Sequence, residues 1–103
     1  MYQKHTLASQ KTVEIRSRTY VEWEASMNKA AELDAPYVEA MKSGDAMGAA
    51  VLSSKNSLIM REDRLQCWVK DWATQKAKLS LADVAEIETA ACVLERGEVL
   101  EKN

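Results

Sequence analysis

The first amphipathic stretch of the chain has apolar residues three or four positions apart, the spacing of an α-helix. At about 100° per residue, Val13, Tyr20, Trp23 and Met27 share one face, and charged residues lie opposite. This pattern predicts a helix over residues 10–33. It also predicts that Trp23 lies in the hydrophobic core.

The next stretch predicts a short helix and then a long one. Pro36 suits the first turn of a helix over residues 36–42, because its missing N–H would have no partner there. A third helix is expected over residues 45–78. The weak helix formers Ser53–Ser57 leave two helices broken near Asn56 as the alternative. Its apolar positions recur every seven residues, at Val51, Leu58, Leu65, Trp72 and Leu79.

A fourth helix is predicted over residues 81–96, with Ser80 as the N-cap and Asp83 as the acid of a capping box. Together these elements predict an all-α fold, a small bundle of about four helices built on a long helical hairpin. We expect a single α-helical domain over residues 1–103, with flexible ends at 1–8 and 98–103.

The seven-residue stripe leaves the role of its two tryptophans open. Trp68 and Trp72 are one helical turn apart beside Leu65, a spacing typical of a buried core. Arg61 interrupts the same stripe, and an unpaired arginine is rare in a dry core. The stripe therefore fits either a core or an interface, and we expect it to support a homodimer.

Composition narrows the class of protein. The chain has 103 residues, a net charge of −2, three glycines and one proline. This near-balanced charge gives no reason to expect nucleic acid or an anionic membrane as a partner. No apolar run reaches the roughly 20 residues of a membrane span, and the first residues do not resemble a secretion signal. A cytoplasmic protein with reduced Cys67 and Cys92 is expected.

No set of residues indicates catalysis. His5 is the single histidine and lies near the N-terminus, away from any partner for acid–base chemistry. The cysteines lack the spacing of a metal site, and the carboxylates lack the histidines of a helical-bundle metal centre. We therefore expect no enzymatic activity, no cofactor and no bound metal.

Residues 79–99 resemble the helix-turn-helix of repressor-type DNA-binding domains, which implies a small helical transcriptional regulator as the alternative function. The stretch between Ala85 and Arg96 is shorter than in that motif, and the turn glycine is missing. Its acidic character opposes binding to phosphate. The resemblance is carried by Leu79, Ser80, Val84, Ala85, Leu94, Glu95, Arg96 and Gly97.

The charges of the C-terminal region suggest a partner. Residues 81–103 carry six acidic and two basic side chains, and residues 61–80 carry five basic and three acidic ones. The acids are expected either to pair with the end of the third helix or to dock a basic protein. The favoured function is a non-enzymatic protein–protein interaction module: an adaptor, a chaperone or an inhibitor, such as a phage or mobile-element protein that blocks a host defence complex. The candidate interface residues are Arg61, Leu65, Trp68, Trp72, Glu88, Glu95 and Glu98.

Overall fold

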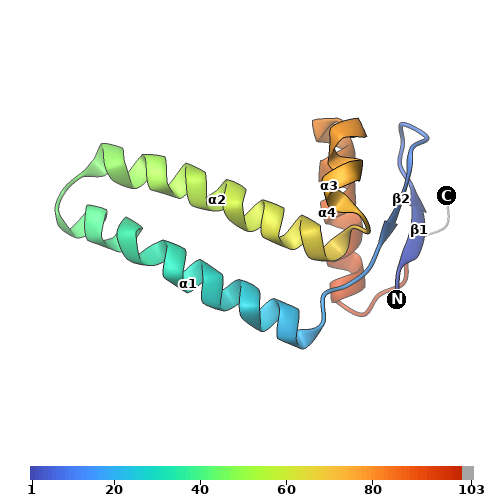
Figure 1. The fold of residues 1–103 in the computed structure, drawn as a ribbon, viewed down its shortest axis with the longest axis horizontal. Coiled ribbons are helices and arrows are strands. Elements are labelled where there is room, and N and C mark those ends of the chain that lie inside the picture. Colours follow the sequence, from blue (N-terminus) through green and yellow to red (C-terminus); the bar gives the residue numbers. More distant parts are fainter. Residues whose placement is uncertain (101–103) are drawn as a thin grey trace. The chain divides into compact units, whose positions relative to one another are not determined.

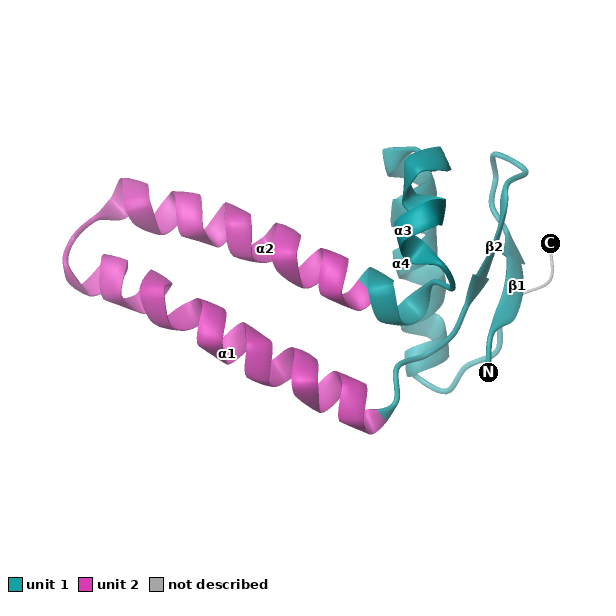
Figure 2. Cartoon of the chain, viewed as in Figure 1, with its two compact units in different colours: residues 1–19, 65–103 teal, residues 20–64 magenta. Residues whose placement is uncertain are grey.

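The computed structural model describes residues 1–100 (Figure 1). They divide into two compact units (Figure 2), each considered by itself below. Unit 1 contains residues 1–19 together with everything from residue 65 onward, and unit 2 contains residues 20–64. Among the described residues, no helix combines the length and apolarity needed to cross a bilayer.

Unit 2 is a helical hairpin, so the expected small, mostly helical fold built on such a hairpin is confirmed. Helix α1 covers Tyr20–Lys42, and helix α2 covers Ala46–Trp68, of which the last turn belongs to unit 1. Gly44, with φ of 78°, supplies the left-handed residue in the turn between them.

The separate helix predicted over 36–42 is wrong, because α1 continues through Pro36. Proline removes one hydrogen bond to the carbonyl of Glu32. Both residues are exposed, so water can satisfy that carbonyl.

The start of the helix predicted over 10–33 is also wrong, because a β-hairpin precedes α1. Strand β1 (Gln3–Thr6) pairs antiparallel with strand β2 (Thr12–Ile15). Alternate β2 residues are buried, which is the period of a strand rather than of a helix. Residues 1–8, for which we expect flexibility, thus contain a strand, and Leu7 is 1% exposed.

The helix predicted over 45–78 is continuous through Ser53–Ser57 but ends earlier, at Trp68. There the chain turns to meet β2: Val69 bridges Ile15, and Lys70 donates its backbone N–H to the Glu14 carbonyl. Asp71 then adopts a left-handed φ of 55°, which separates α2 from the single turn α3 (Trp72–Gln75). A short 3-10 turn, η1 (Lys76–Lys78), follows.

The fourth predicted helix is confirmed as α4 (Leu81–Glu95). Its capping box is present: Asp83 donates its backbone N–H to the Ser80 hydroxyl, and Ser80 donates its own to the Asp83 carboxylate. Gly97, with φ of 76°, follows the helix end. Of the tail expected at 98–103, residues 101–103 lie outside the described part of the chain.

The hydrophobic core of unit 1 combines both ends of the sequence. Its β2 residues, Val13 and Ile15, pack with the last turn of α2 and with the inner face of α4. Trp68 is 2% exposed and Trp72 is 5% exposed, so both tryptophans are core residues. The remaining buried members are Leu7, Leu65, Val69, Ile87, Ala90 and Ala91.

Candidate interaction surface

Helix α1 carries an exposed row of large apolar side chains, which we call the α1 ridge. The row runs along the whole helix, with successive members three to eleven positions apart. At its start, the ring centroids of Tyr20 and Trp23 are 5.6 Å apart. At 100° per residue its members lie within about a 60° arc. The α1 ridge consists of Tyr20 (71% exposed), Trp23 (42%), Met27 (44%), Val38 (44%) and Met41 (56%).

The prediction that Trp23 is a core residue is therefore wrong. Because α1 begins at Tyr20, Val13 lies in β2 and cannot share a helical face with Trp23. Ser26 is instead the fully buried residue among those of α1. The apolar face that the sequence marks as core is thus largely open to solvent.

Polar contacts join the two helices of unit 2. Near the open end of the hairpin, the Ser26 hydroxyl donates to Asp63 Oδ2 at 2.6 Å, and Lys29 Nζ lies 3.4 Å from Asp63 Oδ1. Further along, Asn56 Nδ2 donates to the Leu33 carbonyl at 2.9 Å. These bonds fix the antiparallel register, in which Ser26 faces Asp63 and Leu33 faces Asn56.

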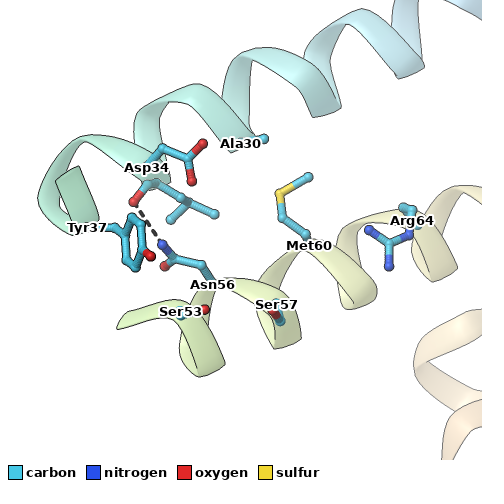
Figure 3. A pocket seen from close by; sticks show the side chains of 9 residues that line it. Ala30, Asp34, Tyr37, Ser53, Asn56, Ser57, Met60 and Arg64 are labelled. Atoms are coloured by element: carbon cyan, nitrogen blue, oxygen red, sulfur yellow. Dashed lines mark hydrogen bonds between the residues drawn. The ribbon is translucent and has the colours of Figure 1, made fainter. Parts of the chain in front are cut away.

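A groove of about 450 Å³ opens between α1 and α2 (Figure 3). Its α2 wall includes the small residues Ser53 and Ser57, and Arg64 lies at one end. Figure 3 shows Met60 extending from α2 toward Ala30 of α1. The groove also borders the α1 ridge, since Ala30 and Asp34 fill the gap in the ridge between Met27 and Val38.

A second exposed apolar row follows α2. Met47 is 82% exposed, Val51 63% and Leu58 62%. Val51 and Leu58 begin the seven-residue stripe whose later member, Leu65, is 1% exposed in the core of unit 1. One sequence pattern thus supplies surface residues in unit 2 and core residues in unit 1.

The apolar candidates for an interface, Leu65, Trp68 and Trp72, offer almost no surface to a partner because they are at most 5% exposed. Arg61 is half-buried and lies on the part of α2 that belongs to unit 2. The structure therefore places Leu65, Trp68 and Trp72 together in the core of unit 1 and places Arg61 in unit 2.

Glu95, one of the acidic interface candidates, forms its hydrogen bonds within unit 1. Its carboxylate accepts from Arg18 Nε and Nη2, both at 2.7 Å, and from the indole N–H of Trp68 at 2.7 Å. The Arg18 guanidinium also lies 5.2 Å from the centroid of the Trp68 ring. Desolvation raises the pKa of Glu95, but the hydrogen bonds from Arg18 and Trp68 outweigh it and lower this pKa to about 2.

Asp83 is engaged in the same way at the other end of α4. It is 3% exposed and accepts from the Ser9 hydroxyl at 2.8 Å and from Lys11 Nζ at 3.1 Å. The backbone N–H of Ser80, then Ser9 and Lys11, lower the pKa of Asp83 well below its usual range, against the opposing effect of desolvation. Nearby, Glu86 accepts the backbone N–H of Ala8.

At Asp83, Glu86 and Glu95, the structure differs from the expected pairing between the α4 acids and the end of the third helix. Their basic partners, Lys11 and Arg18, come from the stretch that the sequence assigns to a helix over residues 10–33 and the structure to a β-hairpin and the segment after it. Trp68, at the end of α2, is a further donor to Glu95. Glu98 is exposed and pairs with Arg96 at 2.7 Å, which lowers the pKa of Glu98. Glu88 is half-buried on α4.

No set of three or more histidine, cysteine or acidic residues within residues 1–100 is placed to hold a metal ion. His5 lies on β1, Cys67 is half-buried and Cys92 is exposed. Residues 81–95 form one continuous helix, so the two helices of a helix-turn-helix are not present in this segment.

Comparisons with known proteins give no relative: no family model matches the chain, and no curated protein or solved structure is significantly similar to it.

Sequence reasoning missed the α1 ridge for an identifiable reason. A seven-residue recurrence runs through Tyr20, Met27, Asp34 and Met41, across the proline that the sequence analysis treats as a helix boundary. Extending the count past Pro36 joins Val38 and Met41 to the row. The spacing indicates a shared face, but it does not distinguish a buried face from an exposed one.

Proposed function

We propose that the protein is a non-enzymatic protein–protein interaction module that docks to its partner through the α1 ridge. The observation that carries this proposal is the exposure of five large apolar side chains in one row. Single exposed apolar residues are ordinary, but several large apolar side chains gathered on one helix face of a small protein are typical of an interaction site.

The residue types support the same function. Tyrosine, tryptophan and methionine are enriched at interfaces, and all three occur in the ridge. Tyr20 and Trp23 provide the kind of aromatic anchor that dominates many binding energies. An adaptor, a chaperone or an inhibitor would each use such a surface by covering part of another protein.

The docking element is the hairpin rather than α4. Asp83, Glu86 and Glu95 have partners within unit 1, so most of the acidic charge of α4 serves the fold. An acid that is already paired contributes less to the steering of a basic partner. A partner that recognises the α1 ridge is therefore expected to depend on apolar contact, with weak dependence on salt.

The experiment compares partner capture by three forms of the chain. The parent, Met27→Asp and Leu81→Asp are immobilised and exposed to lysate of the source cell, and bound proteins are quantified by mass spectrometry. Leu81 is a matched control because it is 75% exposed and lies in the first turn of α4, where an acid suits the helix. Partners retained by Leu81→Asp and lost by Met27→Asp support the proposal. Equal capture by all three forms contradicts it.

A further inference from the structure

Unit 2 has little core of its own. Ser26 and Ala49 are the buried residues in its described range, and hydrogen bonds at Ser26 and Asn56 join α1 to α2. A domain normally needs two packed layers around an apolar core, and two helices form only one. The hairpin therefore lacks the second layer that would cover its apolar face.

The amount of apolar surface matches what one dimer interface needs. From their exposed fractions, the five ridge side chains present roughly 500 Å². A standard interface buries about 800 Å² on each partner, of which about 60% is apolar. The α1 ridge alone supplies that apolar share, and a helix of its 23 residues is roughly 34 Å long, enough for a standard contact.

The shape of this face allows two copies to approach closely at its centre. Large side chains lie at both ends of the ridge, and the small residues Ala30 and Ala31 lie at its centre beside the 450 Å³ groove. If two copies of α1 cross antiparallel about that centre, Met27 of each copy lies opposite Asp34 of the other, at the groove. The small residues Ala30 and Ala31 then lie opposite each other at the two-fold axis, and the large residues of the two ends pack against one another, Tyr20 against Met41 and Trp23 against Val38.

The charges agree with the same placement. The register of the hairpin, fixed by Ser26 with Asp63 and Leu33 with Asn56, sets Arg64 at the level of residue 25 of α1, about 3 Å along the helix axis from Met27. Asp34 of a second copy, opposite Met27, therefore approaches Arg64 of the first at the end of the groove that Arg64 lines. Two-fold symmetry makes this acid–base pair twice in one dimer.

We propose that the protein forms a homodimer in which the two hairpins pack through their α1 ridges as an antiparallel four-helix bundle. This inference rests on the proposed function and names its partner as a second copy of the chain. It moves the contact from the Val51–Leu79 stripe expected from the sequence to α1.

Charge reversal provides the test, with sedimentation equilibrium of the full chain between about 1 and 100 µM as the measurement. The parent is expected at twice its 11.5 kDa chain mass. Asp34→Arg and Arg64→Asp should each raise the dissociation constant by at least about tenfold, and the double reversal should restore the dimer. Met47→Asp is the control, because Met47 is 82% exposed on the other apolar row. The Met47→Asp chain should remain dimeric.

A second measurement tests the dimer by cross-linking, without a charge reversal that could disturb folding. In a Cys67→Ser, Cys92→Ser background, Ala31→Cys should form a disulfide-linked dimer on mild oxidation, since Ala31 lies next to the two-fold axis. A monomeric parent overturns the dimer. A dimer that tolerates both single reversals, or a double reversal that stays dissociated, overturns this geometry. If the parent is monomeric and Met27→Asp still loses a captured partner, the inference fails and the proposed function stands.

Discussion

Glu95→Gln exchanges a carboxylate for an amide of the same size. It is expected to be among the most destabilising conservative substitutions in unit 1. The carboxylate accepts three side-chain hydrogen bonds, from the guanidinium of Arg18 and the indole of Trp68. The Arg18 side chain is only 8% exposed and that of Glu95 is 23% exposed. Glutamine keeps the volume, but it removes the negative charge that faces the Arg18 guanidinium in a partly dry site.

The magnitude follows from the pKa of Glu95. A fall from 4.5 to about 2 means that the folded state favours the carboxylate by about 3 kcal/mol over the protonated form. Because water reaches part of the side chain, we discount this to about 2 kcal/mol. In a domain of this size, such a loss lowers the melting temperature by roughly 8–16 °C.

The pH dependence separates the charge from other effects of the substitution. The pKa of Glu95 is lower in the folded chain than its ordinary value of 4.5, so the carboxylate stabilises the fold fully above about pH 5. This stabilisation is lost as the pH falls from about 5 toward 2. The difference between the parent and Glu95→Gln should therefore be largest near pH 7 and close to zero near pH 2.

The assay is urea unfolding followed by circular dichroism at pH 7, 5, 4, 3 and 2. Glu98→Gln is the matched control, because Glu98 pairs with Arg96 in an exposed bridge and its loss should leave unfolding unchanged. A Glu95→Gln chain as stable as the parent at pH 7, or a stability difference that stays constant from pH 7 to pH 2, would refute the reasoning.

Three other substitutions test local features. Ser80→Ala removes the N-cap of α4 and should lower the free energy of unfolding by about 1 kcal/mol, visible as an earlier urea midpoint. Pro36→Ala restores a backbone donor within α1 and should stabilise the chain by about 1–3 kcal/mol; a lower melting temperature would contradict this. Gln10→Gly relieves a left-handed residue with φ of 72° and should raise the urea midpoint by the equivalent of about 0.5–1 kcal/mol.

The sequence predicted the helices best where local chemistry decides the structure. Ser80 and Asp83 form a capping box from adjacent groups, and α4 begins as expected. Helix α2 is continuous through Ser53–Ser57, as the apolar pattern indicated. In these places the determining contacts are within a few residues of one another, and propensity and spacing describe them well.

The β-hairpin was missed because its stabilising contacts are distant in sequence. Val13 and Ile15 alternate as in a strand, but they are also compatible with the start of a helical stripe. What decides between the two is their packing against Trp68 and Ile87. The end of α2 was missed for the same reason, since Val69 leaves the helix to bridge Ile15.

The candidate interface was the least predictable part. The stripe through Leu58 and Leu65 has a uniform pattern, yet Leu58 is 62% exposed and Leu65 is 1% exposed. Periodicity specifies which residues share a face, but tertiary structure decides what covers that face. Glu95 illustrates the converse, because its acidic character indicated a surface residue and its partners, Arg18 and Trp68, lie 77 and 27 positions away.

The discontinuity of unit 1 has a consequence for the order in which the protein folds. Its core needs β2 from before the hairpin and α4 from after it, so it cannot be completed until residues 20–64 have been spanned. Closing a flexible loop of that length costs roughly 3 kcal/mol in chain entropy. The hairpin forms from local contacts and closes at Ser26 and Asp63, which brings its two ends together before the core assembles. A formed unit 2 thus shortens the effective loop that unit 1 must close, and weakening the bond between Ser26 and Asp63 should slow folding more than it speeds unfolding.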